Sequence, residues 1–176
     1  MDRLDVLLEA LRLKALPRTG WGRRGVPSPE SVASHSWGVG WLVLALLPPH
    51  LDRGKALAYA TVHDLPEVRV GDLTPADGVA KDEKHRRERL AMEGLATGWG
   101  APELLHLWEA YEAQADPESR FVHELDRLDM ALQALTHHEA GAAGMEEFVD
   151  SAERVVRDPV LRPWIEAIRL RMRGHA

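Results

Sequence analysis

The sequence contains neither cysteine nor asparagine, and glutamine occurs only at Gln114 and Gln133. Without cysteine, the chain can form no disulfide and can offer no thiolate to a metal ion. A low content of thermolabile amides is typical of proteins from thermophiles. The excess of arginine over lysine, 18 to 4, fits a coding bias equally well, so both interpretations of the composition stay open.

Long apolar runs are also missing from the sequence. The best candidate, WLVLALL at residues 41–47, is far shorter than the roughly 18 residues that span a bilayer. The first 16 residues place leucines between charged residues and lack the uninterrupted apolar centre of a signal peptide. We therefore expect a cytoplasmic protein that does not enter a membrane.

Positive charge is in deficit, because the formal net charge is −6. A nucleic-acid-binding protein needs a basic surface to displace counterions, so we expect no nucleic acid as partner. A small anion is still compatible with this charge, because it can bind to a local cluster of cations. The chain has 176 residues, of which 45% are hydrophobic and 28% charged, and we expect one globular domain over residues 1–176.

Helical periodicity dominates the sequence, and no segment alternates like a strand. The first helix is expected over residues 2–16, with Leu4, Leu7, Leu8 and Leu11 on one stripe. Residues 17–29 read as a loop because proline and glycine interrupt them, with Ser28 as the cap of the next helix and Pro29 in its first turn. The other expected helices cover residues 29–47, 52–64, 81–97, 101–113, 117–139, 145–156 and the chain from Pro159 onward. The prediction is an all-α domain of about eight helices.

Two histidines, His35 and His63, are the first candidate functional residues. His35 shares a helix face with Val32 and Val39, and a lone histidine in that position is more often a hydrogen-bonded core residue than a ligand. His63 and Asp64 stand together at the end of an apolar helix, with side chains about 100° apart. Pro66 disfavours helical geometry just after them, which predicts that the helix loosens there and presents both side chains to a cleft.

A carboxylate pair flanks the apolar stripe of the segment FVHELDRLDMALQAL. The stripe itself consists of Phe121, Leu125, Leu128, Leu132 and Leu135. Helical projection places Asp129 nearer to this stripe than Asp126. Periodicity alone therefore favours Asp129 as the buried carboxylate.

The order His, His-Asp, Asp on an all-helical chain resembles the HD-domain metal-dependent phosphohydrolases. Four blocks in sequence, LKALPRTGW, PESVASHSW, HDLPEVRVGDLTPADGVAKDEKHRRE and LDRLDMALQA, are similar to the 5′-deoxynucleotidase branch of that family. The resemblance covers about residues 10–140, and the HDxxExxxGD block is its most specific part. It implies a single HD-domain helical bundle that forms a homodimer.

The resemblance also implies one divalent transition-metal ion, with Mn, Co, Ni, Fe and Zn all suited to imidazole and carboxylate ligands. Its implied ligands are His35, His63, Asp64 and Asp126. In choosing Asp126, the resemblance overrules the periodicity argument for Asp129. Members of the family commonly carry an acidic residue before the first histidine, where this chain has Ser34, so support for the His35 imidazole is weaker here or comes from another residue.

Two acidic residues have implied catalytic roles. Glu67 lies four residues after His63, and a continued helical turn would bring it over the same site, where it would position water and transfer a proton. Asp72 resembles a second functional acid that contacts the sugar or the leaving oxygen. The alternatives are a solvated charge at a helix end for Glu67 and loop capping for Asp72.

Four further residues are candidate substrate contacts. Trp21 resembles a tryptophan that walls the sugar and helps to exclude a 2′-hydroxyl, although core packing explains it equally well. Arg18 is a candidate for the phosphate or sugar, and Arg24 competes with it for this role. Lys81 and His85 share one side of a charged helix at four-residue spacing and are candidates for the phosphate, whereas the simplest reading of that helix is an exposed face.

The implied reaction is hydrolysis of a 2′-deoxynucleoside 5′-monophosphate to deoxynucleoside and phosphate. The same metal box also serves phosphodiesterases and nucleoside polyphosphate hydrolases, which form the first alternative. The second alternative is a helical nucleotide-binding protein without catalysis. The base preference, the physiological metal and the cellular substrate do not follow from the sequence.

Overall fold

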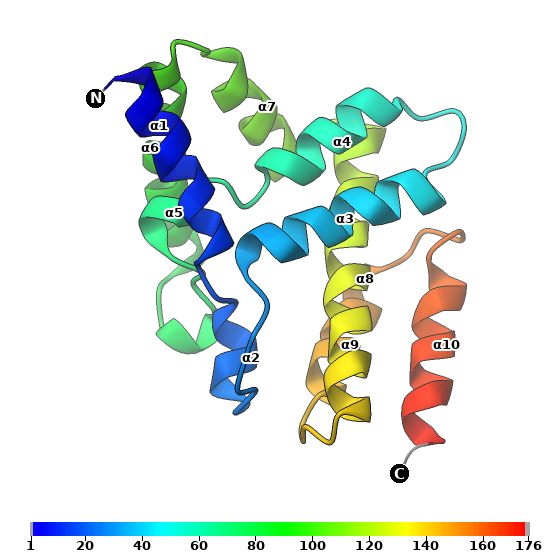
Figure 1. Ribbon diagram of the computed structural model, residues 1–176. Coiled ribbons are helices and arrows are strands. Elements are labelled where there is room, and N and C mark those ends of the chain that lie inside the picture. The colour runs from blue at the N-terminus through cyan, green and yellow to red at the C-terminus, as the bar shows by residue number, and fades with distance from the viewer. Residues whose placement is uncertain (1, 175–176) are drawn as a thin grey trace.

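The computed structural model describes residues 2–174, and over that range its regular elements are all helical (Figure 1). Eight of the α-helices have eight residues or more, which confirms the predicted all-α bundle of about eight helices. The α-helices are α1 (Arg3–Ala10), α2 (Thr19–Arg23), α3 (Val32–Leu46), α4 (Arg53–Val62), α5 (Glu67–Val70), α6 (Lys81–Trp99), α7 (Glu103–Glu112), α8 (Pro117–Glu139), α9 (Glu146–Val155) and α10 (Arg162–Arg173), with two short 3-10 helices, η1 (Leu11–Lys14) and η2 (Pro75–Asp77). Within residues 2–174, no helix is both long enough and apolar enough to cross a membrane.

Helix α8 is the central element, and it contacts α3, α4, α7, α9 and α10. It begins where the sequence predicts, because the Asp116 side chain accepts a hydrogen bond from the Ser119 amide at 2.8 Å and Pro117 occupies the first turn. In Figure 1, α3 and α4 cross its upper half, while α9 and α10 run beside its lower half. The crossing of α3, α4 and α8 determines which side chains meet inside the molecule.

The N-cap of helix α3 lies three residues later than predicted. Its N-cap is Ser31, whose side chain accepts a hydrogen bond from the Ser34 amide, and Ser28 is not the cap. The Arg18 amide donates to the Glu30 carbonyl at 2.9 Å, and Pro17 and Ser31 form an isolated β-bridge. This pairing holds the chain extended before Ser31, and a local capping rule cannot anticipate it.

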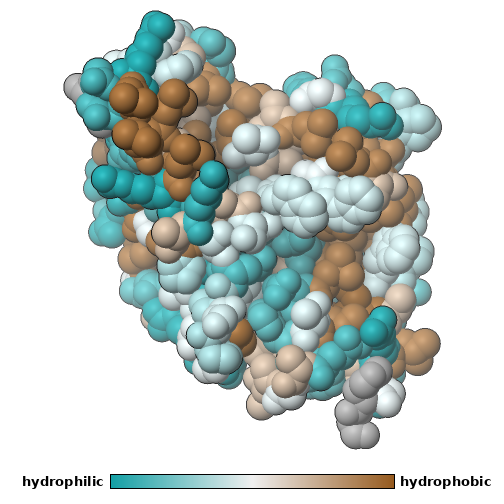
Figure 2. Space-filling model, viewed as in Figure 1, coloured by the Kyte–Doolittle hydropathy of each residue, from teal (hydrophilic) through white to brown (hydrophobic). Residues whose placement is uncertain are grey.

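The N-terminal segment differs from the prediction in two ways. Helix α1 ends at Ala10 and continues as η1, and the predicted loop at residues 17–29 contains the short helix α2. The apolar stripe is also not a core face: its four leucines, Leu4, Leu7, Leu8 and Leu11, are 48–63% exposed. Figure 2 shows apolar side chains gathered over α1 at the upper left of the molecule. The segment is amphipathic as predicted, but its apolar face is exposed and does not pack on the core.

The last helix also begins later than expected, at Arg162 and not at Pro159. The Asp158 carbonyl accepts hydrogen bonds from the amides of Leu161 and Arg162, and its side chain accepts one from the Val160 amide. These bonds form a turn that precedes the helix, so Asp158-Pro159 initiates the turn and α10 follows it.

Candidate metal centre and active site

Three helices deliver the four predicted metal ligands. His35 lies in the second turn of α3, His63 is the C-cap residue of α4, and Asp64 follows it directly. Asp126 lies near the middle of α8. Since α3, α4 and α8 pack against one another, residues far apart in sequence come together at this crossing.

The donor atoms of these residues converge. The Nε2 atoms of His35 and His63 lie 3.3 Å apart, and Asp126 Oδ1 lies 3.1 Å from His35 Nε2. Asp64 Oδ2 lies 3.3 Å from His63 Nε2 and 3.6 Å from His35 Nε2. Both histidines are buried, while the side chains of Asp64 and Asp126 are 18% and 13% exposed. The cluster is therefore closed on the imidazole side and reached from the carboxylate side.

The spacing fits a single small cation. Two ligand atoms about 2.1 Å from an ion, at a tetrahedral angle, lie about 3.4 Å apart. The separations quoted above, all measured from an imidazole, run from 3.1 to 3.6 Å. The donor atoms of His35, His63 and Asp126 form one mutually close group, and Asp64 approaches the two imidazoles. Two neutral imidazoles with two carboxylates also form the mixed nitrogen and oxygen donor set that divalent transition metals prefer.

The electrostatics of the cluster favour positive charge. Burial and the Arg18 guanidinium lower the pKa of His35, but hydrogen bonds to Asp126 and Asp129 outweigh them and raise this pKa to about 10. Burial raises the pKa of the Asp126 carboxyl, yet Arg127 and the two histidines hold it well below its usual range. The carboxylates around His35 thus stabilise positive charge at this place, and a metal ion would supply that charge once it displaces the proton from Nε2.

Each imidazole is held by its other nitrogen. His63 Nδ1 lies 3.0 Å from the Ala60 carbonyl oxygen, and His35 Nδ1 lies 2.7 Å from Asp129 Oδ2. Because a carbonyl or carboxylate accepts a proton from Nδ1, Nε2 of each ring is directed into the cluster and is the nitrogen available to an ion. The geometry therefore matches the arrangement in which both histidines bind an ion through Nε2.

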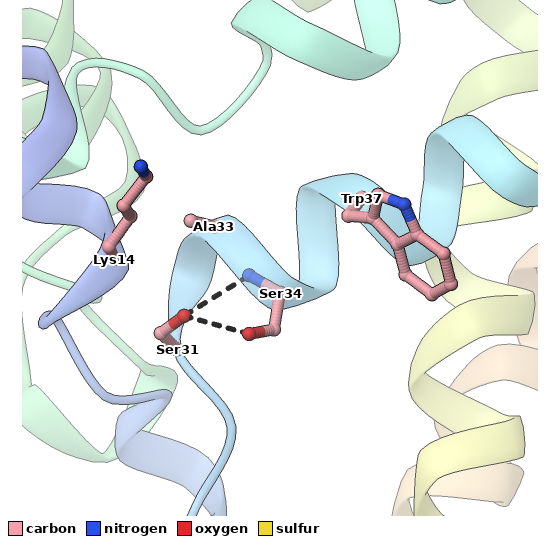
Figure 3. Close-up of a pocket in the computed structure, with 5 residues that line it drawn as sticks. All are labelled: Lys14, Ser31, Ala33, Ser34 and Trp37. Carbon is pink, nitrogen blue, oxygen red and sulfur yellow. Dashed lines mark hydrogen bonds between the residues drawn. The ribbon is translucent and has the colours of Figure 1, made fainter.

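Ser34 does not take part in this support. Its hydroxyl lies 2.9 Å from that of Ser31 at the start of α3, beside an open hollow of about 300 Å³ (Figure 3). The support comes from Asp129 instead, which the sequence could not identify. Periodicity does not separate the two carboxylates by burial, because the Asp126 and Asp129 side chains are 13% and 14% exposed. Hydrophobic periodicity cannot register a polar cluster that forms inside the core.

Glu67 is a buried acid beside the cluster. It is the first residue of α5, only 3% exposed, and its Oε2 has no hydrogen-bond partner among the described residues. Burial, followed by the negative charges of Asp64 and Asp72, raises the pKa of Glu67 to about 10. The helix loosens earlier than predicted, since α4 ends at Val62, before His63 and Asp64, and the Glu67 amide donates to the Asp64 carbonyl in the turn that follows. A strongly perturbed carboxyl with a free oxygen is typical of an acid–base residue.

Arg18 and Asp72 meet at the start of α2. Arg18 Nη1 lies 3.3 Å from Asp64 Oδ2, so its guanidinium borders the ligand cluster. Asp72 Oδ2 accepts a hydrogen bond from the Thr19 amide at the first turn of α2. This contact corresponds to the capping alternative for Asp72, and contact with a substrate stays a prediction.

The other candidate substrate contacts lie away from the ligand cluster. Trp21 is 2% exposed, packs on Phe148 with ring centroids 4.4 Å apart, and donates from Nε1 to Glu30. This is the core-packing alternative, so a sugar-facing role for Trp21 stays a prediction. Arg24 is exposed and pairs with Glu147, which leaves Arg18 as the arginine beside the cluster.

The charged helix α6 presents a different lysine to the site than the sequence suggested. Lys81 and His85 are exposed, and neither has a hydrogen bond or ion pair to the ligand cluster within the described chain; His85 stacks on Trp108. Lys84 is partly buried and donates to the Leu73 carbonyl at 3.2 Å. Phosphate contacts by Lys81 and His85 therefore stay predictions, and the structure adds Lys84.

Charge explains the position of Lys84. Burial lowers the pKa of Lys84, but Glu88, Glu67 and Asp64 raise it overall. Its i,i+4 pair with Glu88, at 3.4 Å, was visible in the sequence and was the available signal for this residue. Tyr111 was missed as well: its buried ring lies 5.5 Å from that of His63, and no local pattern marks it.

Comparisons with known proteins agree with this architecture. A family model described as an HD domain matches residues 10–164. The chain is 41% identical to 5′-deoxynucleotidase HDDC2 of Danio rerio over 165 residues, which cover 89% of this chain and 82% of that protein. It is 39% identical to human 5′-deoxynucleotidase HDDC2 over 156 residues, with coverage of 82% and 76%.

The fold comparison gives the same result. A conserved hypothetical protein from Pyrococcus furiosus superposes with a TM-score of 0.81 at 34% identity, covering 94% of this chain and 98% of that one. The PH0347 protein from Pyrococcus horikoshii superposes equally well, at 31% identity. With the helical fold and the matched region taken together, the chain belongs to the HD domain family.

Proposed function

We propose that this protein is a metal-dependent 5′-deoxynucleotidase, a phosphomonoesterase that hydrolyses 2′-deoxynucleoside 5′-monophosphates to deoxynucleoside and phosphate. Relatives about 40% identical over most of the chain carry this activity in their names. The observation that carries the proposal is the convergence of the His35, His63 and Asp126 donor atoms, with Asp64 adjacent. A nucleotide is also compatible with a chain of net charge −6, because Arg18 and Lys84 concentrate positive charge at the site.

The proposed cofactor is one divalent transition-metal ion, Mn, Co, Ni, Fe or Zn. Its ligands would be His35, His63, Asp64 and Asp126. Such an ion, when bound, supplies Lewis acidity that lowers the pKa of a coordinated water to near 7 and offsets charge at a phosphoryl oxygen.

The chain's own residues would divide the remaining work. Glu67 would hold and move a proton at its unpartnered Oε2, a role worth about 10² to 10⁴ in rate. Arg18 and Lys84 would bind the phosphate by charge, since both lie within electrostatic reach of Asp64 and Glu67. Asp72 would contact the sugar or the leaving oxygen from the adjacent loop. Burial of the two imidazoles excludes water from one side of the site and fixes the orientation of the donors.

The test is phosphate release from a panel of substrates by chelator-treated protein, with each metal added back separately. The panel contains deoxynucleoside and ribonucleoside monophosphates, cyclic nucleotides and nucleoside triphosphates. We expect metal-dependent release from the deoxynucleoside monophosphates, lowered by at least 100-fold in Glu67→Ala. Preferred cleavage of cyclic or polyphosphorylated nucleotides would select the phosphodiesterase or polyphosphate hydrolase alternative. Metal-dependent binding of dAMP without turnover would select the non-catalytic one.

We also propose a single HD domain over residues 1–176 that acts in the cytoplasm as a homodimer and binds no nucleic acid. In favour of a dimer, exposed apolar side chains occur at helical spacing on α3, at Trp37, Trp41 and Leu44, in addition to the α1 leucines. In an isologous dimer, the same apolar stripe of each copy would be buried against the other copy. A standard interface buries about 800 Å² of each partner. Light scattering after size exclusion tests this: wild type should run as a dimer and Trp41→Glu as a monomer.

A further inference from the structure

On the contact between α3 and α8, a glycine of α3 faces an aspartate of α8. A Cβ atom built on Gly38 would lie 3.0 Å from Asp129 Cγ and even closer to Oδ1, a separation that real side chains do not adopt. Gly40, two residues further along the same helix and so on nearly the opposite face, has no heavy atom within 4 Å of a Cβ atom built there. The space at Gly38 is therefore occupied by the Asp129 carboxylate, while the space at Gly40 is open.

The carboxylate that fills this space is the one that holds His35. Asp129 Oδ2 lies 2.7 Å from His35 Nδ1, on the ring edge opposite the ligand cluster. The Glu30 carboxylate also lies near His35 and Asp129. It accepts a hydrogen bond from Trp21 Nε1 at 3.0 Å and so already has a partner. Ser34 bonds to Ser31 and is not available to the ring. Asp129 is thus the residue through which the protein fixes the His35 ring.

We propose that Asp129 is a positioning residue for metal binding and that Gly38 is the glycine that allows it to act. In this scheme, Asp129 accepts the Nδ1 proton of His35 and so keeps the Nε2 lone pair aimed at the ion. Even the methyl group of an alanine at position 38 would displace the carboxylate from Nδ1, although it adds no charge and removes no ligand. The inference rests on the proposed metal site, but it does not depend on which substrate is hydrolysed.

Metal affinity, measured without substrate, tests the proposal. Chelator-treated full-length proteins are titrated with Co²⁺ and, separately, with Mn²⁺ by calorimetry, and the Tm of each metal-free protein is recorded. Loss of a group that supports a ligating histidine lowers metal affinity about 10- to 100-fold. We expect a loss in this range for Asp129→Ala and for Gly38→Ala. Asp129→Asn, which can still accept from Nδ1 but carries no charge, should lose less than Asp129→Ala.

Gly40→Ala is the matched control, because it adds the same methyl group to the same helix where there is room. Alanine is the better helix former at both positions, so Gly40→Ala should not lower the Tm of the metal-free protein. Gly38→Ala should lower it no more than Asp129→Ala does, because both variants lose the hydrogen bond between Asp129 and His35. Gly40→Ala should bind both ions within twofold of wild type. The double variant Gly38→Ala/Asp129→Ala should bind no more weakly than Asp129→Ala, since both changes remove one interaction.

Two results would overturn the proposal. One is wild-type metal affinity, within twofold, in Asp129→Ala or Gly38→Ala. The other is a fall in the Tm of the metal-free protein that is larger in Gly38→Ala than in Asp129→Ala, because this would indicate damaged packing and not only a lost hydrogen bond. A wild-type protein that binds the ions but hydrolyses no deoxynucleotide would end the proposed function and leave this inference standing.

Discussion

Glu67→Gln should make the metal-free protein more stable and the enzyme much slower. The substitution keeps the size of the side chain and removes a carboxyl whose pKa is raised to about 10, chiefly by burial. An unfolded glutamate has a pKa of about 4.3, so above that pH the folded state binds a proton that the unfolded state has lost. Stability therefore falls as pH rises through this range, and the wild type loses stability that the glutamine variant retains.

The magnitude follows from the same shift. Each pH unit above about 4.3 costs the folded wild type about 1.4 kcal/mol, which reaches about 4 kcal/mol at pH 7. The folded pKa lies well above 7, so this figure depends little on its value. Catalysis should change in the opposite sense, with kcat lowered about 10² to 10⁴-fold because the proton-transfer group is gone.

The assay is urea unfolding of both metal-free proteins at pH 5, 6 and 7, with chelator present throughout. The difference in free energy of unfolding should grow with pH in favour of Glu67→Gln, and other titrating groups cancel in that difference. Glu103→Gln, an exposed change in the first turn of α7, serves as the control and should show no such trend. A difference between wild type and Glu67→Gln that stays constant from pH 5 to 7 would refute the reasoning.

Three further outcomes are expected. Asp116→Ala removes the N-cap of α8 and the acceptor of the 2.6 Å hydrogen bond from the Tyr59 hydroxyl. It should lower the free energy of unfolding in urea by about 2–3 kcal/mol, and a loss below about 0.5 kcal/mol would contradict this. Trp108→Phe keeps an aromatic ring but leaves the buried His63 carbonyl without its donor at 3.1 Å, which should cost about 1–3 kcal/mol. An unchanged midpoint would show that water replaces the indole. Adding Co²⁺ at 100 times its Kd should stabilise the metal-free protein by about 3 kcal/mol in thermal unfolding. His35→Ala should abolish this stabilisation, and a stabilised His35→Ala variant would place the ion elsewhere.

Local sequence rules were sufficient to predict the long helices as such, and for α8 they also gave the start. The Asp116-Pro117 pair gave the start of α8 because both residues act within one turn, and that start is confirmed. The order of His35, His63-Asp64 and Asp126 drew attention to residues that the structure brings together, although the sequence pattern alone does not show that they meet. Their meeting depends on the crossing of three helices.

The errors share a physical cause, which is that tertiary contacts decide what local patterns leave open. Ser28 satisfies the capping rule as well as Ser31 does, but pairing of the chain around Pro17 selects Ser31. The leucines of α1 have core spacing, yet only Val6 of that helix is buried. Asp129 has no partner in its own neighbourhood, because its partner lies 94 residues earlier in the chain.

A single turn of α8 contacts both edges of the His35 ring, with Asp126 at Nε2 and Asp129 at Nδ1. A half rotation of the imidazole about its Cβ–Cγ bond would break both contacts together, so the ring has one resting orientation. Rotation or sliding of α8 would likewise disturb both contacts in one movement. The register of one long helix thereby determines which nitrogen of the His35 ring keeps its proton, and no mobile group is needed for this.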